Sequence, residues 1–178
     1  MRRPAVPPKV IRIRPRPGHP TEGLLTLGGA TVPCRLGRSG ITRFKREGDG
    51  ATPAATMRLV ALRYRADRIP RPRTGLPVRA IRPEDGWCDD PADGRYNRPV
   101  RLPFGPSHEA MARQDAVYDI VVVLDWNVSR RSLNRGSAIF LHLTRPDRRP
   151  TAGCVAVDLP VMRRLLAAAG RRAVMAVL

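Results

Sequence analysis

Short apolar stretches, each interrupted by glycine, proline or charged residues, run along most of the chain and predict a protein of many short strands. Residues 10–14 (VIRIR) alternate apolar and basic side chains, as expected of a strand at the edge of a sheet. Residues 24–36 (LLTLGGATVPCRL) contain two apolar runs joined by Gly28 and Gly29. Adjacent glycines adopt the positive φ angles that a two-residue turn requires, so this stretch predicts a β-hairpin.

Four further segments have the patterning of strands. They are residues 58–65, 117–126, 137–143 and the apolar tail 173–178. In the first segment, Val60, Leu62 and Tyr64 are two residues apart and should share one face. The second is apolar and β-branched enough for a buried strand, and the third places Phe140 and His142 on one face.

Two segments predict helices. Residues 108–115 (HEAMARQD) predict a short helix with Ser107 as its N-cap. Residues 159–169 are amphipathic with a helical period, with Pro160 in the first turn and Gly170 as the stop. The helical content is therefore small, one or two short helices.

The remaining stretches define the domain organisation. Residues 1–20 carry six prolines and are expected to form an extended arm rich in proline and arginine. Residues 66–107 are rich in Arg, Pro, Asp and Gly and predict long surface loops, which are usually functional or partly disordered. Residues 21–178 suffice for one domain with its own core. The prediction is a mainly β fold, a curved β-sandwich of short strands.

The formal charge of +18 and the pI of about 11.6 would suit a polyanionic partner. Lysine, however, occurs only at Lys9 and Lys45, and the arginines are scattered along the chain. Aromatic residues make up only 4%, which leaves few side chains on which nucleic-acid bases could stack. We interpret the charge as a compositional bias and expect no nucleic-acid partner.

The N-terminus, MRRPAVPPKVIRIRPRP, is basic but lacks the apolar segment of a secretory signal, and no apolar run is long enough for a transmembrane segment. The three cysteines form no CxxC pair, so they do not predict a zinc site or a disulfide framework. Cys34 and Cys88 either pair in an oxidising compartment or remain reduced.

His142 and Cys154 are the candidate catalytic pair. Imidazole is the side chain best suited to take a thiol proton near neutral pH, and a strand followed by a returning loop would bring the two together. Gly153 lets the backbone approach a substrate closely. The backbone N–H groups from Ala152 to Cys154 would point at a developing oxyanion.

Three segments, residues 45–53, 87–127 and 136–157, follow one another in the order of three motifs of a known family, the L,D-transpeptidase (YkuD-type) catalytic domain family, which the chain resembles. Residues 136–157 (GSAIFLHLTRPDRRPTAGCVAV) resemble its signature, a histidine ending a strand, a loop, and a Ser/Thr-x-Gly-Cys turn. Residues 45–53 (KREGDGATP) resemble its Gly-Asp-Gly-x-Thr-Pro turn. The segment from Trp87 through Tyr96 and Asn97 to Asn127 resembles the stretch before the active site in one branch of the family.

The resemblance implies an acyltransferase that acts on the peptide stems of peptidoglycan. Cys154 would attack a tetrapeptide stem, release D-alanine and leave a thioester, which an acceptor amine resolves into a cross-link. His142 would carry the proton, Gly153 and its neighbours would form the oxyanion hole, and Thr151 would brace the turn. No metal or organic cofactor is implied. The family implies a location in the periplasm or cell envelope. Because no signal peptide is visible, three explanations stay open: the start of the sequence is trimmed, the protein is exported by another route, or it works in the cytosol.

The chain departs from the common family pattern at several positions. Ala152 stands where many members have a second histidine, and Ala156 where an arginine is common. Ala54 and Ala55 follow the Thr-Pro pair in place of the usual x-Gly, and the twelve-residue step from His142 to Cys154 is short. These differences indicate a divergent branch. Two alternatives remain: an L,D-carboxypeptidase-type cysteine hydrolase, or a non-catalytic arginine-rich module that binds anionic wall polymer or nucleic acid.

Overall fold

The computed structural model describes residues 9–178, which form fourteen strands, one short 3-10 helix (η1, Ala116–Tyr118) and one α-helix (α1, Leu159–Ala168). The strands are β1 (Val10–Arg16), β2 (His19–Leu27), β3 (Ala30–Arg35), β4 (Ile41–Thr42), β5 (Thr52–Pro53), β6 (Thr56–Tyr64), β7 (Val78–Ala80), β8 (Asp85–Cys88), β9 (Arg98–Arg101), β10 (His108–Ala110), β11 (Ile120–Leu124), β12 (Phe140–Leu143), β13 (Val155–Val157) and β14 (Val174–Val177). The predicted mainly β fold is confirmed, with one α-helix where one or two were expected.

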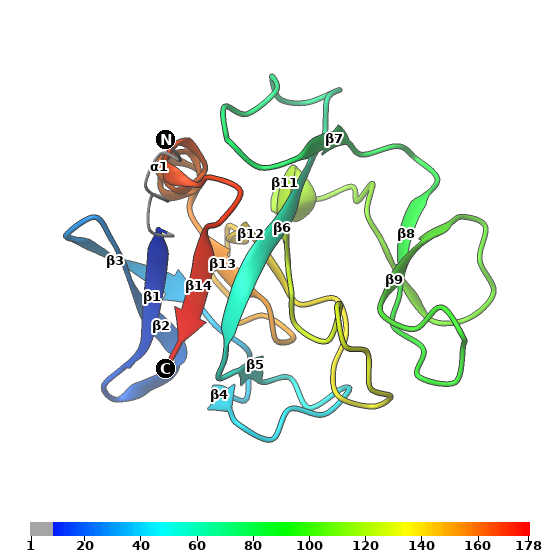
Figure 1. Ribbon diagram of the computed structural model, residues 1–178, viewed down its shortest axis with the longest axis horizontal. Helices are drawn as coiled ribbons and strands as arrows, with labels where there is room; N and C mark the ends of the chain where they lie inside the picture. Colours follow the sequence, from blue (N-terminus) through cyan, green and yellow to red (C-terminus); the bar gives the residue numbers. More distant parts are fainter. Residues whose placement is uncertain (1–8) are drawn as a thin grey trace, which may run out of the picture.

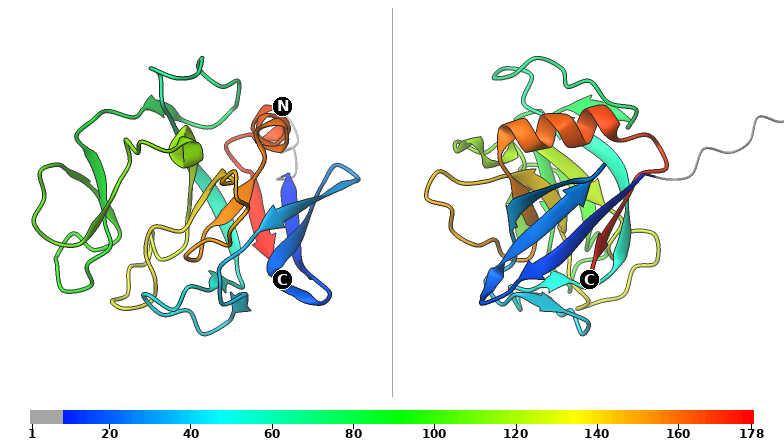
Figure 2. Two further views of the ribbon diagram at one scale, coloured as in Figure 1. Left: turned by 180° about the vertical axis from the view of Figure 1, so that it is seen from behind. Right: turned by 90° about the vertical axis from the view of Figure 1, so that its left-hand side faces the viewer.

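The main sheet is strongly curved and closes on itself. Its strand order is β11-β12-β13-β3-β2-β1-β14-β6-β7, and β11 also pairs with β6, so both ends of the row meet at β6 (Figure 1). The two curved halves face each other as the layers of a sandwich. α1 lies across one end of the sheet (Figure 2, right).

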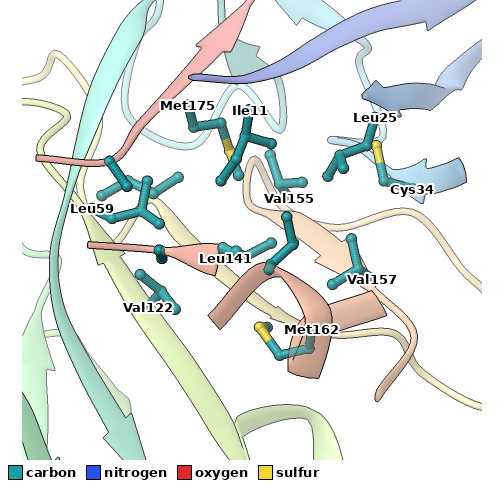
Figure 3. Packing of buried hydrophobic residues seen from close by; sticks show 14 of the residues in the cluster. Ile11, Leu25, Cys34, Leu59, Val122, Leu141, Val155, Val157, Met162 and Met175 are labelled. Carbon is teal, nitrogen blue, oxygen red and sulfur yellow. The ribbon is translucent and has the colours of Figure 1, made fainter. Parts of the chain in front are cut away.

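The core lies inside this curved sheet. Side chains from opposite walls meet there, among them Ile11 of β1, Leu141 of β12 and Val155 of β13 (Figure 3). α1 adds three buried residues, which close that end of the core. They are Met162, Leu165 and Leu166. Burial of this apolar surface is the main stabilising contribution to the fold.

A second, three-stranded sheet (order β10-β8-β9) stands beside the main sheet. Trp87 of β8 packs edge-on against Phe140 of β12, with 5.2 Å between the ring centroids. The indole N–H of Trp87 donates to Asn97 Oδ1 at 2.9 Å, which satisfies its polar group. This contact fixes the small sheet next to the strand that carries His142.

Several predictions from local sequence signals are confirmed. β2 and β3 form the expected hairpin, with positive φ at Gly28 (56°) and Gly29 (85°). α1 has Pro160 in its first turn, and the apolar tail forms β14. Residues 45–53 form the expected turn, and β11 and β12 are buried strands.

Five predictions need correction. Residues 10–16 form a strand, but it is not at an edge, because β1 pairs with both β2 and β14. The expected arm over 1–20 is thus part of the sheet from residue 10 onward, and residues 1–8 lie outside the described residues. Residues 108–115 form no helix, since β10 pairs with β8. The loops expected over 66–107 contain β7, β8 and β9.

The fifth correction concerns β6. Val60 lies on the outer face, whereas Leu62 is buried on the same side as Leu59. The cause is a bulge: Val123 pairs with Ala61 and the next residue of β11 pairs with Leu59, so Val60 is an extra residue. One extra residue reverses the alternation, which a sequence period of two does not reveal.

Cys34 and Cys88 are both free and buried, in β3 and β8 respectively, which belong to different sheets. Within residues 9–178 no helix has the length and apolar character needed to cross a membrane.

Candidate active site

The turn before β13 is held in one shape by its own side chains. Thr151 Oγ1 donates to the carbonyl oxygen of Cys154 at 2.6 Å and accepts from the N–H of Gly153 at 3.1 Å. Gly153 has φ 138°, and a Cβ there would lie 2.9 Å from the carbonyl oxygen of Ala51. Glycine is therefore required at 153, and the Thr151 hydroxyl links the Gly153 N–H to the Cys154 carbonyl oxygen across the turn.

The turn at residues 45–53 packs against the turn that carries Cys154. Thr52 Oγ1 accepts from the N–H of Gly37 at 2.8 Å and contacts the carbonyl oxygen of Cys154 at 3.4 Å. The carboxylate of Asp49 accepts from the N–H of Ala51 at 2.9 Å and pairs with the buried ammonium of Lys45. The second segment of the family resemblance thus supports the turn that carries Cys154.

The Cys154 thiol lies where β12 and β13 meet. Its Sγ donates to the carbonyl oxygen of Ala138 at 3.2 Å and accepts from the N–H of Phe140 at 3.3 Å. Burial raises the pKa of this thiol to about 12, the negative charge of Glu109 adds to the rise, and the Phe140 N–H opposes it. The resting cysteine is therefore a neutral thiol.

His142 lies on the same face of the neighbouring strand. It pairs directly with Ala156 in the parallel register of β12 and β13, two residues beyond Cys154. Its Nδ1 lies 2.9 Å from the carbonyl oxygen of Leu143. Because that carbonyl can only accept, Nδ1 carries the hydrogen and Nε2 is the basic nitrogen.

Burial lowers the pKa of His142 to about 4, and the charges of Arg113 and Arg145 contribute to this shift. The ring meets the Tyr118 ring edge-on at 5.5 Å. The thiol hydrogen bond is made to Ala138 and not to the imidazole. The resting pair is thus a neutral thiol and a neutral imidazole with its basic nitrogen unprotonated.

Cys154, His142, Thr151 and Ala152 all line one open cavity of about 300 Å³. One set of charged lining residues is basic: Arg38, Arg113, Arg145 and Arg149. The other is acidic: Glu47, Asp89 and Glu109. Such a volume accommodates part of a peptide, and the lining offers both signs of charge to it.

The acidic wall comes from the small sheet and from the turn at 45–53. Glu109 of β10 accepts from the Tyr118 hydroxyl at 3.4 Å, and burial raises the pKa of its carboxyl. Glu47 accepts from the hydroxyls of Tyr96 and of Ser137, the latter at 2.8 Å. One buried carboxylate oxygen of Asp89 has no hydrogen-bond partner among the described residues.

Four further polar residues have structural partners of their own. Asp115 caps η1 and pairs with Arg113, and Asp119 pairs with Arg68, so neither is bonded to His142. Asn97 and Asn127 adopt positive φ angles, and their side-chain amides donate to backbone carbonyl oxygens.

His19 is exposed, and His108 contacts the carbonyl oxygen of Pro106. Within residues 9–178 no group of three or more metal-ligating side chains forms a candidate metal site.

Sequence reasoning missed Arg38, Glu109 and Tyr118 as cavity residues. They come from three separate segments that only the folded sheets bring to the cavity. Tyr118 carried one signal, because tyrosine occurs only three times in a chain poor in aromatic residues.

Comparisons with known proteins identify the family. The model of the YkuD family, the L,D-transpeptidase catalytic domain, matches residues 24–174. No curated protein and no solved structure matches the chain. Since the matched segment contains both candidate catalytic residues and most of the fold, the chain belongs to the YkuD family of L,D-transpeptidase catalytic domains.

Proposed function

We propose that the chain is a peptidoglycan L,D-transpeptidase in which Cys154 is the nucleophile and His142 its base. The observation that carries the proposal is that His142 of β12 and Cys154, which directly precedes the adjoining parallel strand β13, line one cavity. Membership of a catalytic family associated with peptidoglycan supports the choice of substrate. We place the reaction in the cell envelope, where its substrate occurs.

In the acylation step, a carbonyl of the donor stem approaches Sγ and the thiol leaves its hydrogen bond to Ala138. The Sγ–C bond forms as Nε2 of His142 accepts the thiol proton. The imidazolium then gives this proton to the departing amine, and the C–N bond to D-alanine breaks. The product is a thioester on Cys154 and free D-alanine, with His142 neutral again.

In the second step, the acceptor amine attacks the thioester carbonyl. His142 takes a proton from the attacking amine and returns it to the departing sulfur, which restores the neutral thiol. The new amide is the cross-link. Water in place of the amine would give an L,D-carboxypeptidase, and the product distinguishes the two reactions.

The oxyanion formed in each step needs a hydrogen-bond donor near Sγ. The Gly153 N–H is already bonded to Thr151 Oγ1. We therefore assign the donor role to the adjacent backbone N–H groups of Ala152 and Cys154, while Thr151 and Gly153 maintain the shape of the turn. Because the resting pair is neutral, charge develops only as the transition state forms, where these dipoles act on it.

The experiment is intact-protein mass spectrometry after incubation with a carbapenem, an acylating β-lactam. We expect a mass shift in the wild type and in a Cys34→Ala, Cys88→Ala control, and none in Cys154→Ala. The same variants are then given tetrapeptide-containing muropeptides, with D-alanine release and cross-linked product measured separately.

Acylation that persists in a folded Cys154→Ala variant would exclude the proposed nucleophile. Release of D-alanine without cross-linked product would identify the hydrolase. Steeply salt-dependent polymer binding by a protein that is never acylated, and that binds equally with Cys154→Ala, would identify the binding module instead.

A further inference from the structure

The four arginines that line the cavity differ in one respect. Arg113 makes a bidentate pair with Asp115, with both N–O distances at 2.8 Å. Arg149 pairs with Asp147 at 2.6 Å, and Arg145 lies 3.6 and 3.7 Å from carboxylate oxygens of the same two residues, Asp115 and Asp147. Among residues 9–178, Arg38 has no carboxylate partner. Its charge is thus the one in the basic wall that remains without a counter-ion.

Arg38 is nevertheless held in a defined place. Its backbone N–H donates to the carbonyl oxygen of Thr151 at 2.9 Å, which joins it to the turn that carries Cys154. Its Nη2 donates to the carbonyl oxygen of Gly48 at 3.2 Å. The side chain also lies against Gly50, where a Cβ would come within 2.7 Å of the guanidinium carbon. The absence of a side chain at Gly50 therefore makes room for the arginine.

These contacts use only part of the guanidinium group. It has five N–H donors in a planar fork, and one bond to Gly48 leaves donors that can bind a carboxylate in bidentate fashion. Ala152 and Ala156 line the same cavity and offer no charged side chain, so Arg38, whose backbone N–H is bonded to Thr151, supplies a cation beside the Cys154 turn.

The opposite wall restricts where an anion can bind. Glu109 and Asp89 lie on the same face of the small sheet, because Glu109 pairs with Trp87, two residues before Asp89. Both line the cavity, and carboxylates there repel a further carboxylate. On the Arg38 side the carboxylate of Glu47 is already bonded to the hydroxyls of Tyr96 and Ser137, so the unused guanidinium donors of Arg38 favour an anionic group there.

We propose that Arg38 binds a carboxylate of the donor stem and so determines which peptides acylate Cys154. This inference rests on the proposed transpeptidase function. A tetrapeptide stem offers a terminal carboxylate on the departing residue and internal carboxylates. The chemistry of recognition is the same for both, and the test separates them.

The test uses three synthetic stems: one unmodified, one with a terminal carboxamide, and one in which only the internal carboxylates are amidated. The rate of thioester formation on Cys154, as kcat/KM, is measured for wild type, Arg38→Gln and Arg38→Lys. Arg43→Gln is the matched control, since Arg43 is an exposed arginine of the adjacent segment and does not line the cavity.

We expect Arg38→Gln to lower kcat/KM for the unmodified stem about 10- to 100-fold, the range for loss of a charged hydrogen bond. Amidation of the recognised carboxylate should lower the wild-type value similarly and have little further effect in Arg38→Gln. The stem that shows this non-additivity identifies the carboxylate. Arg38→Lys should recover part of the loss, and Arg43→Gln should match the wild type.

Equal losses for all three stems in Arg38→Gln, or unchanged kinetics, would overturn the inference while leaving the transpeptidase intact. Failure of the proposed function gives a different result, because the wild type itself would then form no thioester with any stem. In that case the inference falls with the function on which it rests.

Discussion

The neutral resting state of Cys154 predicts an unusual dependence of its reactivity on pH. The thiol has a pKa of about 12 against the ordinary value of 9.0. At pH 7 its thiolate fraction is therefore ~10⁻⁵, compared with ~10⁻² for an unperturbed cysteine. A thiolate of higher pKa is more nucleophilic, and a Brønsted slope of ~0.4–0.5 over three units returns a factor of ~15–30. Alkylation at pH 7 should thus be slower than that of a free thiol by roughly one to two orders of magnitude.

The assay is alkylation by iodoacetamide, followed by intact-protein mass, in a Cys34→Ala, Cys88→Ala background where Cys154 is the remaining cysteine. Between pH 6 and 9.5 the rate should rise about tenfold per unit without a plateau, because the thiolate stays the minor form throughout. Circular dichroism at each pH serves as the control for folding. A rate that is independent of pH over this range would refute the reasoning, since it would indicate a preformed thiolate–imidazolium pair.

Three further predictions concern stability. His142 has a folded pKa of about 4, below its ordinary 6.5, so the free energy of unfolding in urea should be highest above pH 6.5 and fall by about 3 kcal/mol as the pH drops toward 4. His142→Gln should remove this pH dependence. The same pH dependence in His142→Gln and the wild type would contradict the assignment. Thr52→Val leaves the buried N–H of Gly37 without an acceptor and should cost about 1–3 kcal/mol, whereas Thr52→Ser should not; equal losses would show that the hydroxyl is unimportant. Trp87→Ala removes the contact with Phe140 and should cost about 3–5 kcal/mol in thermal unfolding; a smaller effect would mean that the small sheet is held elsewhere.

Local sequence signals were sufficient where the structure is determined locally. The glycine pair of the β2–β3 hairpin and Pro160 of α1 both act within a few residues, and both predictions hold. The helix predicted over residues 108–115 was wrong for the opposite reason, because this segment is determined by a distant partner. Their strand is specified by pairing with β8, about twenty residues away, and this partner overrides the helical signal of the segment.

The candidate site likewise contains residues that local sequence identifies and residues that only the fold brings together. Cys154, His142 and Thr151 lie in one continuous sequence segment and were found from its pattern. The cavity walls come from distant segments, and the register of the sheets decides which of their side chains reach it. Arg38 follows β3, and Glu109 lies in β10, so neither has a sequence neighbour that marks it as a cavity residue.

The position of β14 has a consequence for biosynthesis. It is the last strand of the described chain, yet it fills the space between β1 and β6, parallel to one and antiparallel to the other. A nascent chain must therefore wait for residues 174–177 before the ring of strands can close. Until then, β1 and part of β6 present unpaired backbone edges of the kind that recruit other chains into aggregates. The pairing of β14 with β1 joins the strands with the greatest sequence separation in the main sheet. Delayed synthesis or loss of β14 would therefore expose the protein to misassembly more than a change in any other strand pairing.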